Sequence, residues 1–173
     1  RTNLNIKIEL DEANRTLTIR DNGIGMTQDE VENNLGVIAK SGSYAFKEAL
    51  EGKQDDIDII GQFGVGFYSA FMVADKVEVF THSINESESV HFESTGEDGY
   101  KIDSCEKQER GTRIVLHLKK NEDEEDYDSY LKSYTVKRLI NKYSDYVRYP
   151  ILMNEEEKDY DDKGEVTYYK FVE

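Results

Sequence analysis

The sequence predicts an α+β fold, a two-layer sandwich in which helices cover one face of a mostly antiparallel sheet. Helix-like patterns gather in the first half of the 173-residue chain, and strand-like patterns dominate the second half. Strands and helices do not alternate, which argues against a doubly wound parallel sheet. With no internal repeat and no low-complexity linker, we expect one domain over residues 1–173.

The chain opens with a predicted β-hairpin. Residues 5–10 and 16–20 alternate polar and apolar side chains, and the turn between them is polar. Thr27, with Glu30 three residues later, matches a capping box and predicts a helix over about residues 28–35.

The rest of the chain contributes a buried helix, several strands and a long amphipathic helix. Residues 64–74 are apolar on nearly all sides, which predicts a buried helix that begins at a glycine-rich turn. The other predicted elements are a short helix at 44–51, strands at 76–82, 89–94, 99–104 and 112–118, a helix at 130–146, and two short strands near the end.

Composition excludes several classes of partner. The formal net charge is −15, which argues against nucleic acid or an anionic membrane as the main partner. No apolar run is long enough to span a membrane, and no signal peptide is visible. Cys105 is the single cysteine, which suits a reducing, cytoplasmic compartment. Because the chain starts at Arg1 and enters a strand at once, we expect it to be a fragment of a longer protein.

Asp21 begins the first candidate site. It follows a predicted strand, and Gly23 and Gly25 leave room for a flat ligand to approach the backbone. An ionised carboxylate accepts hydrogen bonds, such as one from the exocyclic amine of adenine, and Met26 offers an apolar wall. A plain hairpin turn is an equally good interpretation of this stretch alone. A calcium loop is excluded, because glycines stand at two ligand positions.

A second glycine-rich stretch runs from Gly61 to Phe67 and precedes the predicted buried helix. Free N–H groups and the positive end of a helix would suit phosphates there. The stretch is neither a Walker loop nor a dinucleotide fingerprint, and a flexible connector remains an alternative. Between the two glycine motifs, Asn34, Lys40 and the small residues 41–43 could form a lid over a nucleotide. A surface lysine is the simpler interpretation of Lys40.

Thr112 opens a strand after Arg110 and Gly111, and it would lie near Asp21 if its strand pairs with residues 16–20. An ordinary strand threonine is the alternative. No metal site is assigned to the three histidines, which show no ligand spacing with Cys105. Six tyrosines are expected to pack in the core or on helix faces: Tyr127, Tyr130, Tyr134, Tyr143, Tyr146 and Tyr149.

Together and in this order, these motifs resemble the amino-terminal ATPase domain of the ninety-kilodalton heat-shock chaperones, above all the bacterial cytosolic member. The resemblance covers nearly the whole chain, and the stretch from Gly61 to Ala70 is its most specific part. The Asp21 motif is shared with DNA gyrase, mismatch-repair ATPases and histidine kinases. The stretches that carry the resemblance are residues 21–26, 34–36, 38–42, 60–70, 110–112 and 142–145.

The resemblance implies a nucleotide site with ATP or ADP as ligand and a mobile lid over about residues 27–66. Asp21 would bind the adenine amine with help from Thr112. Other residues would line the adenine pocket or surround the sugar and phosphates. The implied ligand-binding residues are Asp21, Gly25, Met26, Asn34, Leu35, Lys40, Gly61, Gln62, Phe63, Gly64, Val65, Gly66, Phe67 and Thr112.

The resemblance also implies what this chain does not supply. The catalytic glutamate and the Mg²⁺-binding asparagine of the family lie on a helix before the Asp21 strand, so we expect both upstream of Arg1. Glu30 and Asn34 mimic their spacing but follow Asp21, and they are not assigned these roles. The intact protein would be a homodimeric, ATP-hydrolysing chaperone that acts on client proteins, with co-chaperones as further partners. A DNA-acting or kinase ATPase and a non-catalytic interaction module are the alternatives.

Overall fold

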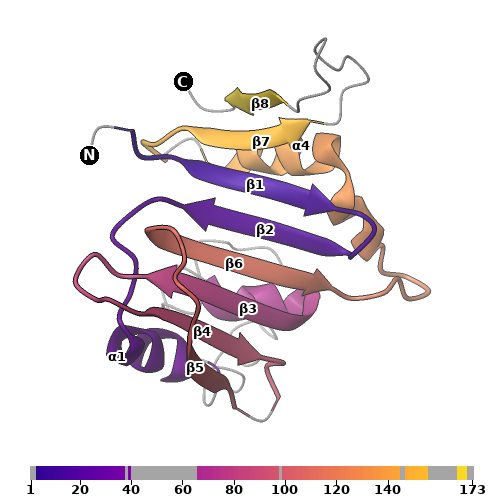
Figure 1. The fold of residues 1–173 in the computed structure, drawn as a ribbon. Helices are drawn as coiled ribbons and strands as arrows, with labels where there is room; N and C mark the ends of the chain where they lie inside the picture. Colours follow the sequence, from indigo (N-terminus) through magenta and orange to yellow (C-terminus); the bar gives the residue numbers. More distant parts are fainter. Residues whose placement is uncertain are drawn as a thin grey trace.

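The computed structural model contains an eight-stranded sheet with the strand order β5-β4-β3-β6-β2-β1-β7-β8 (Figure 1). Neighbouring strands are antiparallel except for β1 and β7, which are parallel. The structure describes residues 3–37, 39, 66–97, 99–144, 147–155 and 167–170. The strands are β1 (Ile6–Asp11), β2 (Thr16–Asp21), β3 (Ala74–His82), β4 (Ser89–Ser94), β5 (Lys101–Cys105), β6 (Gly111–Leu118), β7 (Ile151–Glu155) and β8 (Thr167–Lys170).

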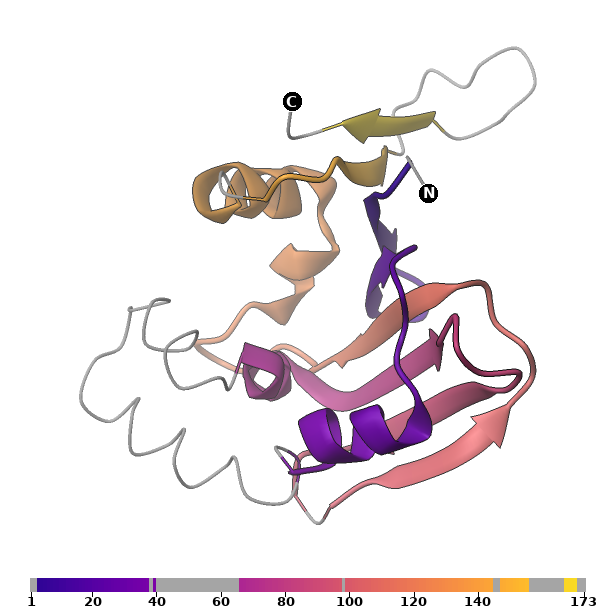
Figure 2. The ribbon, with the colours of Figure 1, turned by 90° about the vertical axis from the view of Figure 1, so that its left-hand side faces the viewer.

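The helices lie on one face of this sheet, behind it in Figure 1, and Figure 2 shows the same layers from the side. The predicted α+β class is therefore confirmed, and so are the hairpin and the four later strands. The helical elements are α1 (Gln28–Val31), the π-helix η1 (Glu32–Gly36), the 3₁₀-helices η2 (Gly66–Met72) and η3 (Tyr127–Leu131), and α4 (Ser133–Tyr143).

The capping box is present at the start of α1. The Thr27 hydroxyl accepts a hydrogen bond from the Glu30 N–H at 3.2 Å, and the Glu30 carboxylate accepts one from the Thr27 N–H at 2.8 Å. These two contacts satisfy donors that the first helical turn leaves without partners. The helical region continues past the predicted end near residue 35, and after Val31 it runs as a π-helix to Gly36.

Two predicted helices have different bounds in the structure. The expected buried helix over 64–74 appears as the 3₁₀-helix η2, and strand β3 already begins at Ala74. Phe71 is buried, whereas Met72 is 46% exposed, so one side of this segment faces solvent. The predicted 44–51 helix lies outside the described residues.

The long helix predicted over 130–146 is shorter and is preceded by η3. Lys132 has φ −98° and ψ 125°, an extended conformation that separates η3 from α4. Two of the tyrosine predictions are wrong, because Tyr134 is 68% exposed and Tyr149 is 50% exposed. Val136 and Ile140 instead form the buried side of α4.

Two hydrophobic clusters hold the helices to the sheet. The larger one includes Phe92 and Val79 from the sheet and Val31 from α1, all with no exposed surface. The smaller one joins α4 to β1 and β7 through Ile140 and Met153. Among the described residues, no helix has the length and apolar character that crossing a membrane requires.

Candidate functional site

Asp21 and Thr112 lie directly opposite each other on β2 and β6, as the sequence predicted. They share the helix-bearing face of the sheet with Ile19 and Ile114, because side chains alternate along a strand. The Asp21 Oδ1 atom accepts a hydrogen bond from the Gly23 N–H at 2.9 Å. This contact fixes the carboxylate at the end of β2, where the chain leaves the sheet.

Thr81 links the Asp21 loop to the same end of the sheet. Its hydroxyl accepts a hydrogen bond from the Met26 N–H at 2.9 Å and donates to the Gly111 carbonyl at 3.2 Å. Thr81 Oγ1 also lies 3.0 Å from Thr112 Oγ1. A hydroxyl has one proton, so Thr112 donates in this pair and keeps its own lone pairs to accept further bonds.

Gly25 has a structural role in addition to the one that its spacing suggested. Its φ is +68°, and a Cβ atom there would lie 2.0 Å from the His82 carbonyl oxygen. The glycine therefore lets the loop approach the end of β3, rather than simply leaving space for a ligand. Gly111, with φ +119°, makes a similar approach to the Asp21 carbonyl oxygen.

Residues 22–24 are held by contacts on both sides. The Arg110 Nε–H donates to the Gly23 carbonyl at 2.9 Å, and the Asn5 N–H donates to Asn22 Oδ1 at 2.9 Å. The Ile84 N–H donates to the Ile24 carbonyl at 3.1 Å. Because three separate segments bind this loop, the Asp21 carboxylate is positioned before any ligand arrives.

The other predicted site residues lie in the core, on the surface or outside the residues that the structure describes. Met26, Leu35 and Phe67 are partly buried and pack against the larger hydrophobic cluster. Asn34 is exposed on η1. Gly66 is the first residue of η2. The residues that fall outside the described chain are Lys40, Gly61, Gln62, Phe63, Gly64 and Val65.

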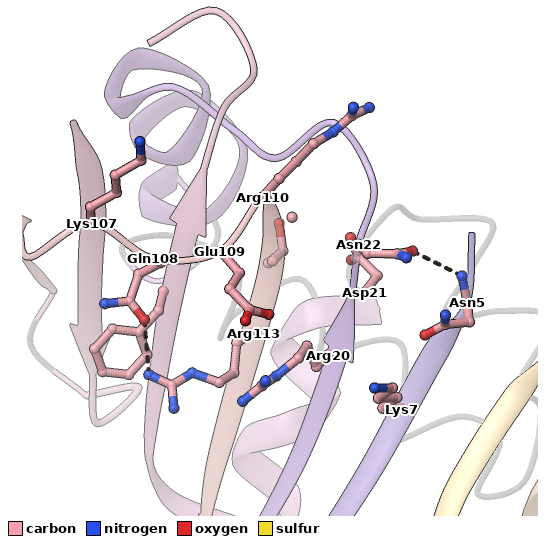
Figure 3. Close-up of a pocket in the computed structure, with 13 residues that line it drawn as sticks. Asn5, Lys7, Arg20, Asp21, Asn22, Lys107, Gln108, Glu109, Arg110 and Arg113 are labelled. Carbon is pink, nitrogen blue, oxygen red and sulfur yellow. Dashed lines mark hydrogen bonds between the residues drawn. The ribbon is translucent and has the colours of Figure 1, made fainter. Parts of the chain in front are cut away.

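A cavity of about 680 Å³ opens beside this loop (Figure 3). Its lining includes Asp21 and Thr112, but Arg20, Arg113 and Phe80 come from the opposite face of the sheet. Figure 3 shows the Arg20 and Arg113 side chains extending in the same direction. The Arg113 guanidinium lies 4.3 Å from the centre of the Phe80 ring. Such a cationic surface suits anions and differs from the acceptor-rich face of Asp21.

Sequence reasoning missed Thr81 and Arg110 as supports of the site. Thr81 looks like an ordinary β-branched strand residue, and only the pairing of β3 with β6 brings it to Thr112. The position of Arg110 just before Gly111 was noted, but its bond to Gly23 depends on the path of the chain before β6. Neither contact leaves a short-range signal in the sequence.

Replacing Thr81 with valine should lower the free energy of unfolding by about 1–3 kcal/mol, because the partly buried Met26 N–H and the buried Gly111 carbonyl each lose a hydrogen-bond partner. Denaturant unfolding of the variant measures this loss. Thr18→Val is a matched control, since Thr18 is also buried and its hydroxyl bonds to none of the described residues. Equal losses in the two variants would contradict a special role for the Thr81 hydroxyl.

Comparison with known proteins gives one family and several relatives. A model of the family described as histidine kinase-, DNA gyrase B- and HSP90-like ATPases matches residues 2–124. The chain is similar to three proteins named chaperone protein HtpG. It is 57% identical to that of Clostridium acetobutylicum over 148 residues, which are 86% of this chain and 24% of the relative.

The other two relatives give similar values. Identity to the Shouchella clausii protein is 58% over 149 residues, which are 86% of this chain and 24% of the relative. Identity to the Oceanobacillus iheyensis protein is 54% over 171 residues, which are 99% of this chain and 27% of the relative. The chain thus spans about a quarter of the length of the curated relatives that it matches.

Proposed function

Since this chain belongs to the family of histidine kinase-, DNA gyrase B- and HSP90-like ATPases, we propose that the Asp21 face of its sheet binds the adenine of ATP. The observation that carries the proposal is the opposition of Asp21 and Thr112 on one face. Both side chains present acceptors there, a carboxylate and the lone pairs of a hydroxyl whose proton is held by Thr81. The exocyclic amine of adenine is a donor of matching chemistry.

Apolar surface beside Asp21 supports the same assignment. Ile19 lies two residues earlier on the same face and is 36% exposed, although Ile8 opposite it on β1 is buried. Met26, on the other side of the loop, is partly buried against the larger core cluster. A flat ring bound between these side chains would cover apolar surface while its amine reaches the carboxylate.

The sugar and phosphates are assigned to the segment that joins α1 to η2. We propose that Asn34, Leu35, Lys40 and the stretch Gly61 to Phe67 surround them, and that residues 27–66 act as a lid. The family resemblance and the glycine spacing support this assignment. Asn34 lies exposed in a π-helix, a kind of segment that often occurs at functional sites.

Magnesium does not fit the described residues of this face. Among the described residues, the group of three histidine, cysteine or carboxylate side chains close enough to share an ion is Glu78, His91 and Glu93. These residues lie on the opposite face of the sheet from Asp21. The nucleotide would carry Mg²⁺ through ligands elsewhere in the intact protein, and no step proposed for this chain passes through the ion.

For the intact protein we propose an ATP-driven molecular chaperone of the cytoplasm. The relatives named chaperone protein HtpG support this role. Nucleotide binding would close the lid and control the conformation of a homodimer, and hydrolysis would reset it while client proteins are folded. Client proteins and co-chaperones would be further partners of the intact protein.

The adenine assignment predicts that Asp21→Asn binds ATP about 10- to 100-fold more weakly, the effect of a buried hydrogen-bond pair worth about 1–3 kcal/mol. Asparagine keeps an oxygen for the Gly23 N–H, so the loop should survive the change. Calorimetric titration of the intact protein with ATP measures the affinity, and the melting temperature checks the fold.

Asp103→Asn is the matched control, because Asp103 is an exposed carboxylate on β5. It should bind ATP as the unmodified protein does. If Asp21→Asn keeps full affinity while both variants fold, Asp21 does not anchor adenine. A loss of affinity in both variants would indicate a general charge effect and would remove the support for this site.

A further inference from the structure

A cluster of histidine and glutamate side chains lies on the face of the sheet that carries no helices. The cluster lies on the adjacent strands β4, β3 and β6, and this face of the sheet is turned toward the viewer in Figure 1. Glu78 on β3 is directly opposite Glu93 on β4. His91 on β4 and His117 on β6 flank Glu78 on its two sides, each displaced by two residue pairs along the ladder and so on the same face.

Three of these residues are spaced as metal ligands. One ligand atom each from Glu78, His91 and Glu93 lies within 4.8 Å of the other two. The His91 Nε2 atom is 3.1 Å from Glu78 Oε1. Around a tetrahedral Zn²⁺ with bonds of about 2.0–2.2 Å, ligand atoms stand about 3.3–3.5 Å apart. Small side-chain rotations would therefore bring the three atoms onto one ion.

The charges also favour a cation at this point. Two carboxylates directly opposite each other on neighbouring strands destabilise a sheet. Lys76 offsets this only in part, because its Nζ atom is 4.0 Å from Glu93. Burial alone would raise the pKa of Glu78, but hydrogen bonds from His117 and His91 outweigh it and hold that pKa below its usual value. A cation bound between Glu78 and Glu93 would relieve the repulsion of these two facing carboxylates.

The neighbours of the cluster hold its ligands in place. His117 Nε2 is 2.6 Å from Glu78 Oε2, the carboxylate oxygen that His91 does not contact. The His91 ring stacks on Phe80 with 4.6 Å between ring centres. Metal-binding side chains are commonly oriented by such outer contacts. Each of the four cluster residues is intermediate in burial, so an ion can reach them from solvent.

We propose that Glu78, His91 and Glu93 bind one Zn²⁺ ion, with water in the fourth position and His117 orienting Glu78. An imidazole with two carboxylates suits zinc better than calcium or magnesium, which prefer oxygen ligands alone. Zinc would lie between His91 Nε2 and Glu78 Oε1, which are 3.1 Å apart in the structure. This site is independent of the proposed nucleotide site, which lies on the other face.

Calorimetric titration of the intact protein with zinc chloride at pH 7.5, about one unit above the usual histidine pKa, tests the proposal. His91→Ala and Glu93→Gln should each lose one equivalent of bound zinc or bind it at least tenfold more weakly. Zinc should also raise the melting temperature of the unmodified protein and not that of His91→Ala. Calcium at the same concentration should do neither.

His82→Gln is the matched control, because His82 lies on β3 but contacts Ser89 rather than the cluster. It should keep the full zinc stoichiometry. The proposal is overturned if His91→Ala and Glu93→Gln, both folded, bind zinc like the unmodified protein. It is equally overturned if calcium binds as well as zinc, since the imidazole would then not be a ligand. ATP binding should not change in any of these variants, which separates this test from that of the nucleotide site.

Discussion

Gly25→Ala should lower the free energy of unfolding by about 2–5 kcal/mol, the sum of left-handed backbone strain and a steric clash. The φ of Gly25 is +68°, and its Cβ would meet backbone atoms of His82 and Ser83 at 2.0–2.9 Å. Backbone atoms in a sheet cannot move aside as the end of a side chain can. The loop must therefore lift away from β3, which also breaks the bond from Met26 to Thr81.

Denaturant unfolding of the Gly25→Ala variant measures this loss, and an ATP titration should show weaker binding because the Asp21 loop moves. Gly99→Ala is the control. Gly99 also has a positive φ, +99°, but a Cβ there would meet no atom within 4 Å. It should lose only the strain, about 1–2 kcal/mol. Equal losses at the two positions would mean that the approach to His82 contributes nothing.

Phe92→Ala should cost about 3–5 kcal/mol, the usual loss for truncating a large aromatic side chain in a core. Phe92 has no exposed surface. Its ring centre is 6.0 Å from that of Phe67 on η2 and 5.3 Å from that of Tyr100. Tyr100 in turn lies against Gly36, where a Cβ would meet its ring at 2.6 Å. The cavity left by the missing ring would therefore loosen η1, which lies inside the proposed lid, and η2, which begins at the end of that lid.

Thermal or denaturant unfolding of Phe92→Ala gives the magnitude, and hydrogen exchange shows where protection is lost. We expect the loss in η1 and η2, with α4 protected nearly as before, because α4 packs on the other hydrophobic cluster. Tyr134→Ala, at a side chain 68% exposed, should stay within about 0.5 kcal/mol of the unmodified protein. A small loss in Phe92→Ala would mean that the core refills the space.

Sequence patterns predicted most of the sheet. Alternation of polar and apolar side chains marked the hairpin of β1 and β2, because successive side chains of a strand point to opposite faces. The capping box marked the start of α1, because it depends on residues three apart. The pairing of Asp21 with Thr112 was predicted on the condition that their strands are neighbours, and they are.

Other features depend on contacts that local patterns do not encode. Apolar side chains on all sides predicted a buried helix over residues 64–74. In the structure, β3 pairs with β6 from Ala74 onward, so Ala74 belongs to the sheet. The histidines were assigned no metal site, because spacing along the chain does not show that His91 and Glu78 meet across two strands. Gly25 was interpreted as leaving room for a flat ligand, whereas its contact with His82 depends on tertiary structure.

The order of strands has a consequence for how the site forms during synthesis. β2, which ends in Asp21, lies between β1 and β6, and β6 is made about 90 residues later. On its other edge, β1 pairs with β7, which lies near the end of the described chain. While β6 is still inside the ribosome, Thr112 is missing from the sheet, and Thr81 lacks this partner on the neighbouring strand. If adenine binds at Asp21 as proposed, nucleotide would bind only after most of this segment has left the ribosome, and ATP binding would follow completed folding.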